Sequence, residues 1–151
     1  MRHWLMKSEP GDFSIDDLER VGVEPWDGVR NYQARNFMRD QMTAGDKAFF
    51  YHSNCKTPAI VGIMEIAGAA YPDPTAFDPK DPHYDPNSDP YSPTWMLVEV
   101  RFVRKLENPV TLERMRREAA LEGMQLLKRG NRLSVFPVDR PHWERIIQLS
   151  K

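Results

Sequence analysis

The sequence predicts an α+β fold, in which a small, curled and mostly antiparallel β-sheet of about five or six strands is surrounded by helices. Segments with the alternation and β-branched residues of strands are short, and they do not alternate regularly with helices. A parallel βαβ arrangement is therefore not favoured. The chain has 151 residues, 40% of them hydrophobic and 28% charged, which suits one soluble globular domain over residues 1–151.

The N-terminal third predicts one strand and two helices. Residues 3–7 form the strand. Ser14 stands at the N-cap of the first helix, with acidic residues in its first turn. The second helix runs from about Asn31 to Met42, with its apolar side on one face, and Gly45 is expected to close it.

Two strands and a long loop follow. Residues 46–53 form a strand with an aromatic core, and residues 59–67 form a second strand, in which Gly62 indicates a bulge or bend. Residues 72–93 contain seven of the 13 prolines, so they cannot form a regular element. Aromatic residues within this loop favour packing over disorder.

The C-terminal third predicts two further strands and short helices. Residues 95–104 alternate clearly and form a strand, and a short helix starts at Thr111. A second short apolar segment covers residues 121–127, a turn follows at Gly130-Asn131, and residues 132–138 form the last strand. Pro141 begins a terminal helix. Trp4, Trp95 and Trp143 are expected in the core.

Composition excludes several classes of protein. No apolar run approaches the ~20 residues of a membrane span, and the N-terminus lacks the features of a signal peptide. The single cysteine, Cys55, excludes an internal disulfide and a multi-cysteine zinc site. We therefore expect a cytoplasmic protein, or a nuclear one in a eukaryote.

The net charge of −1 predicts no nucleic-acid partner by itself, but the charge is unevenly distributed. Residues 71–99 hold six acids and one lysine, whereas residues 101–132 hold nine Lys or Arg and four Glu. Such asymmetry can produce a basic face on a nearly neutral protein, or only two solvated surfaces of opposite sign.

The segment from Trp26 to Asn36 is the most informative part of the chain. Trp26 offers a flat face for stacking, Gly28 permits a tight turn, and Arg30 matches phosphate or carboxylate groups. Asn31 lies at a helix N-cap, where free N–H groups attract anions. The structural alternative is a buried tryptophan, a turn and a capped helix.

Catalytic and metal-binding patterns are weak. His52 and Cys55 would point to opposite faces of a continuing strand, so His52 is poorly placed to activate the thiol. Ser53 and Asn54 are more consistent with a pocket lining or a turn. The segment Asp85–Asp89 starts like a calcium loop, but Pro90 and Met96 occupy the required glycine and glutamate positions, so we expect no metal and no cofactor.

Several blocks, in order, resemble the EVE domain family over nearly the whole chain, from about Trp4 to Trp143. The blocks are residues 4–10, 26–36, 49–55, 71–73, 83–86 and 132–135. The resemblance implies a PUA-like fold and a relation to readers of modified bases. It also implies a nucleic-acid-binding module, with DNA or RNA carrying a modified base as its partner. Because the sequence shows no convincing catalytic constellation, we do not expect an enzyme.

Combining the residue patterns with this resemblance gives a pocket for a single flipped-out base. The expected base-binding residues are Ser8, Trp26, Asn31, Tyr32, Ser53, Asn54 and Tyr84. The expected phosphate-binding residues are Lys7, Arg30, Arg35, Arg132 and Ser134. The hypothesis requires the indole of Trp26 to be reachable from solvent. Two alternatives remain, an enzyme acting on a base or thioester through Cys55, and a protein-interaction domain that uses the proline-rich loop.

Overall fold

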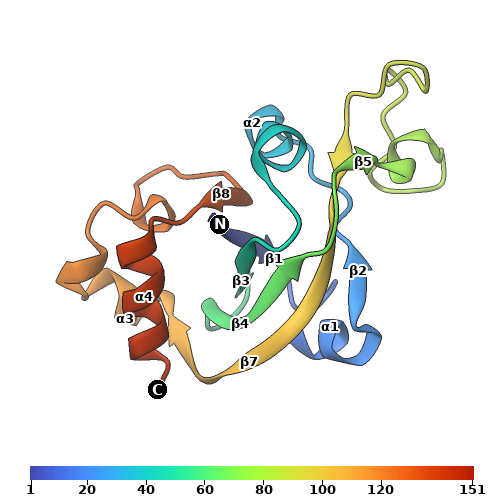
Figure 1. The fold of residues 1–151 in the computed structure, drawn as a ribbon. Helices are drawn as coiled ribbons and strands as arrows, with labels where there is room; N and C mark the ends of the chain where they lie inside the picture. The colour runs from blue at the N-terminus through green and yellow to red at the C-terminus, as the bar shows by residue number, and fades with distance from the viewer.

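The computed structural model of the protein describes all 151 residues and contains a curled six-stranded sheet with the strand order β2-β7-β4-β3-β1-β8 (Figure 1). Its strands are β1 (His3–Ser8), β2 (Val23–Pro25), β3 (Lys47–His52), β4 (Ala59–Ile66), β7 (Glu99–Thr111) and β8 (Val135–Pro137). A separate two-stranded ribbon joins β5 (Tyr71–Pro72) to β6 (Met96–Leu97).

The sheet is mixed, because β1 and β3 run parallel and every other neighbouring pair is antiparallel. This arrangement confirms the predicted fold class of a mostly antiparallel, curled sheet with surrounding helices. The parallel pair is possible because a long connection, which includes two helical segments, separates β1 from β3.

Two hydrophobic cores cover the two faces of the sheet, and alternate residues of each central strand enter different cores. In β1, Trp4 and Met6 belong to the first core, whereas Leu5 belongs to the second. Burial on both faces explains why this strand is a continuous apolar run. The expected core tryptophans Trp4, Trp95 and Trp143 are 0%, 7% and 9% exposed, which confirms their assignment.

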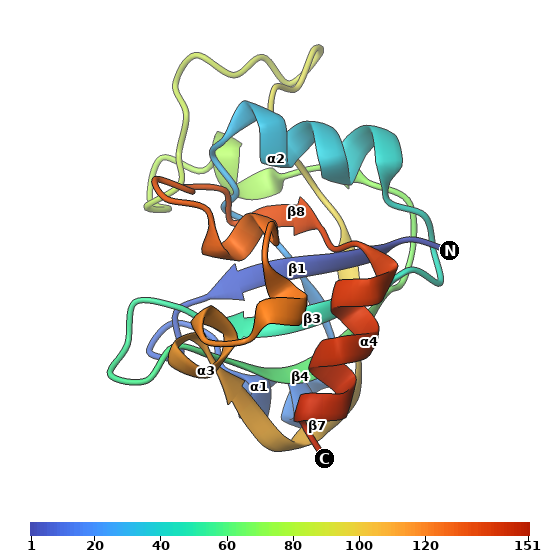
Figure 2. The ribbon, with the colours of Figure 1, turned by 90° about the vertical axis from the view of Figure 1, so that its left-hand side faces the viewer.

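Helices cover each core from outside. The regular helices are α1 (Ile15–Val21), α2 (Tyr32–Asn36), α3 (Leu112–Arg116) and α4 (Arg140–Leu149). α1 and α2 contribute buried residues to the first core, whereas α3 and α4 contribute to the second. Short 3₁₀ helices cover Pro74–Phe77, Ala119–Leu121 and Gln125–Leu127. Figure 2 shows α4 passing beside the ends of β1 and β3.

The two predicted helix caps are present. The Ser14 hydroxyl accepts a hydrogen bond from the backbone N–H of Asp17, whose carboxylate accepts one from the Ser14 N–H, so both ends of a capping box form. The Asn31 side chain accepts a hydrogen bond from the Ala34 N–H at 2.9 Å. Both caps satisfy N–H groups that have no partner within the helix.

The second helix differs from its prediction in its geometry. After α2 the chain continues as one π-helical turn over Phe37–Gln41, and the Met42 N–H donates to the Phe37 carbonyl. The helix ends because Met42 is extended, three residues before Gly45. Gly45 instead donates its N–H to Ile66 and does not close the helix.

The sheet also corrects two predicted strand boundaries. β7 extends to Thr111, beyond the predicted end at residue 104, because it pairs with β2 near its start and with β4 along much of its length. β8 covers only Val135–Pro137 of the predicted 132–138 strand, and these three residues form the regular ladder with β1. The register irregularity predicted at Gly62 is present, and a Cβ there would collide with the side chain of Ile15.

Candidate functional site

A cavity of ≈540 Å³, which we call the Trp26 pocket, opens where β1, β2 and β3 end. Its volume lies within the usual range of small-molecule sites. It brings together segments far apart in the sequence. The lining residues are Lys7, Ser8, Glu9, Asp12, Phe13, Glu24, Pro25, Trp26, Asp27, Gly28, Val29, Arg30, Ser53, His83 and Ser134.

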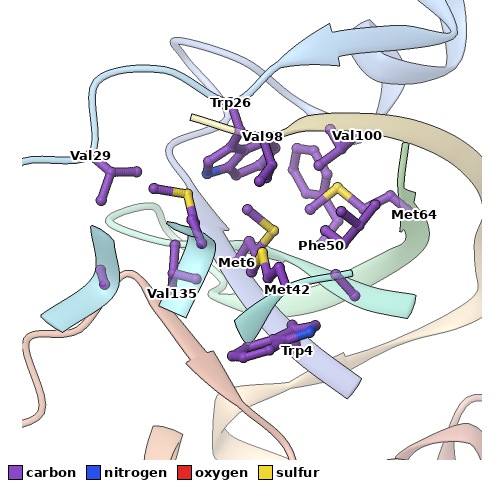
Figure 3. Close-up of a cluster of buried hydrophobic side chains, with 14 of the residues drawn as sticks. Trp4, Met6, Trp26, Val29, Met42, Phe50, Met64, Val98, Val100 and Val135 are labelled. Atoms are coloured by element: carbon purple, nitrogen blue, oxygen red, sulfur yellow. The ribbon is translucent and has the colours of Figure 1, made fainter. Parts of the chain in front are cut away.

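Trp26 lines the pocket, but most of its indole belongs to the first core. The residue is 7% exposed, and its ring meets the ring of Phe50 edge-on at 5.4 Å between centroids. Figure 3 shows the indole beside Val98 and Phe50. Only a small part of the ring is therefore available to a ligand. Phe13 and His83 add further ring surface to the same cavity.

Three serines reach the pocket from neighbouring strands. Ser8 ends β1, Ser53 follows β3, and Ser134 precedes β8. The strand pairing continues past the strand ends, since the Ser53 N–H donates to Ser8 at 3.0 Å and the Lys7 N–H donates to Ser134 at 2.8 Å. The Ser8 hydroxyl donates to the Phe13 carbonyl at 2.5 Å. The strand order therefore places three small polar side chains on one rim.

The pocket wall is rich in carboxylates. Glu9, Asp12, Glu24 and Asp27 all line it. Partial burial, reinforced by Asp27, raises the pKa of Glu24, and partial burial, reinforced by Asp73, raises the pKa of Asp27. Such a wall favours hydrogen-bond donors over anions. The expectation that this segment receives a negatively charged group directly is therefore not supported by the charges around it.

Arg30 holds the loop of residues 73–83 against the turn after β2. Its guanidinium pairs with Asp73 at 3.0 Å and donates to the Thr75 hydroxyl and to the carbonyls of Val29 and His83. Its cationic centre also lies 5.3 Å from the centroid of the Trp95 ring. These partners engage all three guanidinium nitrogens, so Arg30 has a structural role in this loop. Its expected contact with phosphate stays a prediction.

Asp73 is the buried centre of this connection. The residue is fully buried and accepts hydrogen bonds from the Gly28 N–H at 2.8 Å and the Thr75 N–H at 2.9 Å, as well as from Arg30. Burial alone would raise the pKa of Asp73, but the hydrogen bonds from Thr75, Gly28 and Arg30 outweigh it and hold that pKa below its usual value.

Gly28 allows the tight turn predicted after Trp26. Its φ of +78° is in the region that favours glycine. A Cβ at this position would lie within 2.9 Å of three atoms of the His83 ring. The missing side chain therefore lets His83 approach the turn and complete the pocket wall.

Several expected site residues lie outside the Trp26 pocket. The Asn31 side chain caps α2, and Tyr32 stacks on Trp95 at 5.0 Å. Asn54 donates to Glu9 from a left-handed backbone conformation. Tyr84 is exposed on the proline-rich loop and does not line the cavity.

The expected phosphate-binding residues separate into two groups. Arg35 resembles Arg30, because its guanidinium donates to the Asn36 side chain and to the Thr94 carbonyl. Lys7 and Ser134 line the pocket, and Arg132 is exposed close to Ser134 in the sequence. Burial lowers the pKa of the Lys7 ammonium. Lys7, Ser134 and Arg132 are thus better placed than Arg30 and Arg35 to meet phosphate.

The residue patterns did not identify Asp73, His83, Glu24 and Asp27 as site residues. Asp73 carried a usable local signal, since an Asp before Pro74-Thr75 is typical of a helix or turn cap, and it does cap the 3₁₀ helix Pro74–Phe77. The convergence of the pocket acids had no local signal, because it depends on how distant segments fold together.

The alternative based on Cys55 finds little geometric support. The Cys55 sulfur lies 3.8 Å from the carbonyl of His52, and the His52 Nε2 accepts a hydrogen bond from the Ile15 N–H at 3.1 Å. Burial lowers the pKa of His52. This ring nitrogen therefore helps to hold α1 and does not contact the thiol.

No group of three or more His, Cys, Asp or Glu side chains is arranged to hold a metal ion. None of the helices combines the length and apolar character needed to cross a bilayer.

Comparison with known proteins gives matches over nearly the whole chain. The EVE domain family model matches residues 2–149. Thymocyte nuclear protein 1 of Homo sapiens is 42% identical over 168 aligned positions, which cover 99% of this chain and 74% of that protein. The corresponding mouse protein is 44% identical with the same coverage.

Solved structures agree with these matches. A crystal structure of a Pseudomonas putida protein superposes with a TM-score of 0.95 at 46% identity and covers 99% of both chains. Human THYN1, crystallised in complex with DNA containing 5-methylcytosine, superposes with a TM-score of 0.94 at 42% identity, covering 100% of this chain and 98% of that one.

Proposed function

This chain belongs to the EVE domain family, and on that premise we propose that it binds nucleic acid by accepting one modified base in the Trp26 pocket. The observation that carries the proposal is a cavity of ≈540 Å³ that combines ring surfaces with small polar and acidic side chains. A flipped-out base requires such a combination, since its faces are apolar and its edge carries hydrogen-bonding groups. We propose DNA before RNA, because the related human protein was crystallised with DNA.

The acids on the pocket wall suggest which edge of a base is read. A carboxylate accepts hydrogen bonds and cannot donate them when ionised, so it favours a base that presents an amino group. Cytosine carries an amino group where thymine carries a carbonyl oxygen. We propose that Asp27 or Glu24 accepts from the amino group of a cytosine-type base, with Ser8 and Ser53 contacting its remaining polar atoms.

A methyl group at the 5-position would then need contact with an apolar part of the wall. Phe13, Pro25 and Val29 provide such surface in the pocket. The faces of the base would stack on the accessible part of the Trp26 ring and on the His83 ring. Lys7, Ser134 and Arg132 are proposed to meet the phosphates near the mouth of the pocket.

We propose that residues 1–151 form a single domain, which is supported by a family match over residues 2–149. A role without catalysis is supported by the human relative, which was crystallised in complex with DNA containing 5-methylcytosine. The relatives are named as nuclear proteins, which supports a nuclear location if this chain comes from a eukaryote. We propose a cytoplasmic location if it comes from a bacterium.

A binding titration with three matched oligonucleotides tests the function. The oligonucleotides differ only at one central position, which holds 5-methylcytosine, cytosine or thymine, and each is used as a single and as a double strand. We expect the 5-methylcytosine oligonucleotide to bind most tightly in at least one form. Equal affinity for all three, within twofold in both forms, would contradict the proposed function.

Substitution of Asp27 tests the reading of the base edge. Asp27→Asn should reduce the preference for 5-methylcytosine over thymine by roughly 10- to 150-fold, since a hydrogen bond to a charged group is worth about 1.5–3 kcal/mol. Asp139→Asn is the matched control, because Asp139 is exposed and its side chain makes no cap hydrogen bond at α4. A preference that stays at the parent value in Asp27→Asn would exclude Asp27 as a reader.

A further inference from the structure

A second cavity, of ≈430 Å³, lies on the side of the second core and has the opposite charge character to the Trp26 pocket. We call it the basic groove and define it by Lys7, Arg116, Lys128, Arg129 and Asn131. The residues that line it include four cations and no acid. The Trp26 pocket has four acids on its wall.

The four cations of the basic groove are free of ion pairs. The ion pairs of the protein involve other Lys and Arg residues, including the nearby Arg117, which pairs with Glu113, and Arg145, which pairs with Glu118. Like charges that share one cavity repel one another unless an anion enters it. Their arrangement therefore favours a ligand with negative charge.

Asn131 lies in the wall of the basic groove in one fixed orientation. Its side-chain oxygen accepts hydrogen bonds from Gln125 Nε2 at 3.0 Å and from the Leu133 N–H at 3.2 Å, which fixes the orientation of the amide. Its Nδ2 is buried and has no partner. The ordered Asn131 amide therefore forms part of the groove wall, and the four cations supply the charge of the groove.

Lys7 connects the two cavities because it lines both. Alternation along β1 places Lys7 on the same face as Leu5, toward the second core, whereas the next residue, Ser8, points to the other face. β8, the neighbour of β1, is the last strand of the sheet. Residues 126–131, after α3, line the groove together with Lys7, and Figure 2 shows this segment, in orange, passing β1.

We propose that the basic groove binds backbone phosphates of the same nucleic-acid strand whose modified base occupies the Trp26 pocket. The strand would pass the end of β1 at Lys7 and continue along Arg116 and Arg129. This inference rests on the proposed function, since it takes the base in the Trp26 pocket as the starting point. Phosphate contacts position a strand without reading its sequence.

The double variant Arg116→Gln/Arg129→Gln tests the groove. The probes are a single-stranded hexanucleotide with one central 5-methylcytosine, the same hexanucleotide with cytosine, and the nucleoside 5-methyl-2′-deoxycytidine, which has no phosphate. The control is Arg104→Gln/Arg117→Gln, which removes the same charge from two exposed arginines that do not line the groove. Thermal unfolding confirms that each variant is folded.

Each phosphate contact with a single strand contributes about 0.7 to the slope of the logarithm of affinity against the logarithm of salt concentration. Loss of two contacts should lower that slope by about 1.4 and weaken hexanucleotide binding about 25-fold at 0.1 M salt. The nucleoside affinity and the ratio between the methylated and plain hexanucleotides should stay at the parent values. The control should show less than a third of the change in slope.

The outcomes separate the groove from the proposed function. An unchanged slope and hexanucleotide affinity within twofold of the parent would overturn the groove, even if the parent prefers the methylated probe. A weaker affinity for the free nucleoside in the groove variant would also overturn it, because the effect would then not depend on phosphate. The parent could bind both hexanucleotides equally while the variant shows a lower salt dependence of binding. In that case the proposed base-reading function is wrong and the phosphate site stands.

Discussion

Replacement of Asp73 by alanine should destabilise the protein severely, because this carboxylate links the turn after β2 to the proline-rich loop. Asp73 is fully buried and accepts hydrogen bonds from Gly28, from Thr75 and from Arg30. Asp73→Ala leaves two backbone N–H groups without their acceptor and Arg30 without its counter-charge.

The size of the effect follows from these contacts. Breaking a buried ion pair by removing one partner costs about 3–5 kcal/mol. The lower figure applies because the Arg30 side chain is 23% exposed and keeps part of its hydration. A loss of about 3 kcal/mol in a domain of this size lowers the melting temperature by roughly 6–12 °C, at about 2–4 °C for each kcal/mol.

Thermal unfolding by differential scanning calorimetry measures this change. The control is Asp78→Ala on the same loop, where the carboxylate accepts a single hydrogen bond from the Lys80 N–H in an exposed setting. The control should stay within about 0.5 kcal/mol of the parent. If Asp73→Ala melts within about 2 °C of the parent, Asp73 does not hold the pocket wall as described.

Three further predictions concern acid stability, the turn and the role of Arg30. Asp46 is buried and accepts hydrogen bonds from the Trp4 indole N–H and from the backbone N–H groups of Arg2 and Thr43. Hydrogen bonds outweigh burial at both Asp73 and Asp46 and lower their pKa values, so their stabilisation is complete above the unfolded pKa of about 3.9 and is lost as the pH falls through the lower folded values. Urea unfolding should therefore show a loss of stability below about pH 4, and a constant free energy of unfolding between pH 5 and pH 2 would disprove this prediction. Gly28→Ala combines a strained positive φ with a collision against His83, so it should lower the free energy of unfolding by about 1–3 kcal/mol. The same urea unfolding measures this change, and a variant as stable as the parent would show that the turn relaxes freely. Arg30→Ala should lower the melting temperature but leave the salt dependence of oligonucleotide binding unchanged, and a slope lowered by a unit would restore Arg30 as a phosphate contact.

Local sequence signals were sufficient for most elements of the fold. Ser14 and Asn31 were recognised as caps because a side-chain oxygen at an N-cap satisfies N–H groups within the next three residues. Gly62 was recognised as an irregularity because glycine weakens a strand and allows close approach. The core tryptophans and the order of most strands and helices also followed from local pattern. The short strand β2, the β5–β6 ribbon and the 3₁₀ helix Pro74–Phe77 within the proline-rich loop were not predicted.

Strand pairing and the boundaries of the elements were harder to predict from the sequence. The parallel pairing of β1 with β3, and the extension of β7 to Thr111, depend on partners distant in the sequence. The π-helical turn after Asn36 likewise has no signature in the sequence that distinguishes it from a continued α-helix. Hydrogen bonds between segments decide these features, and the sequence of one segment does not indicate which other segment it will pair with.

The site shows the same division. The sequence alone identified the segment around Trp26, the serines at the strand ends and the family, because these depend on residue types and their local order. Only the tertiary structure decided that Arg30 is occupied by Asp73, 43 residues away, and that acids gather at one cavity and unpaired cations at another. Electrostatic interactions depend on distances in space, and these distances exist only once the chain is folded.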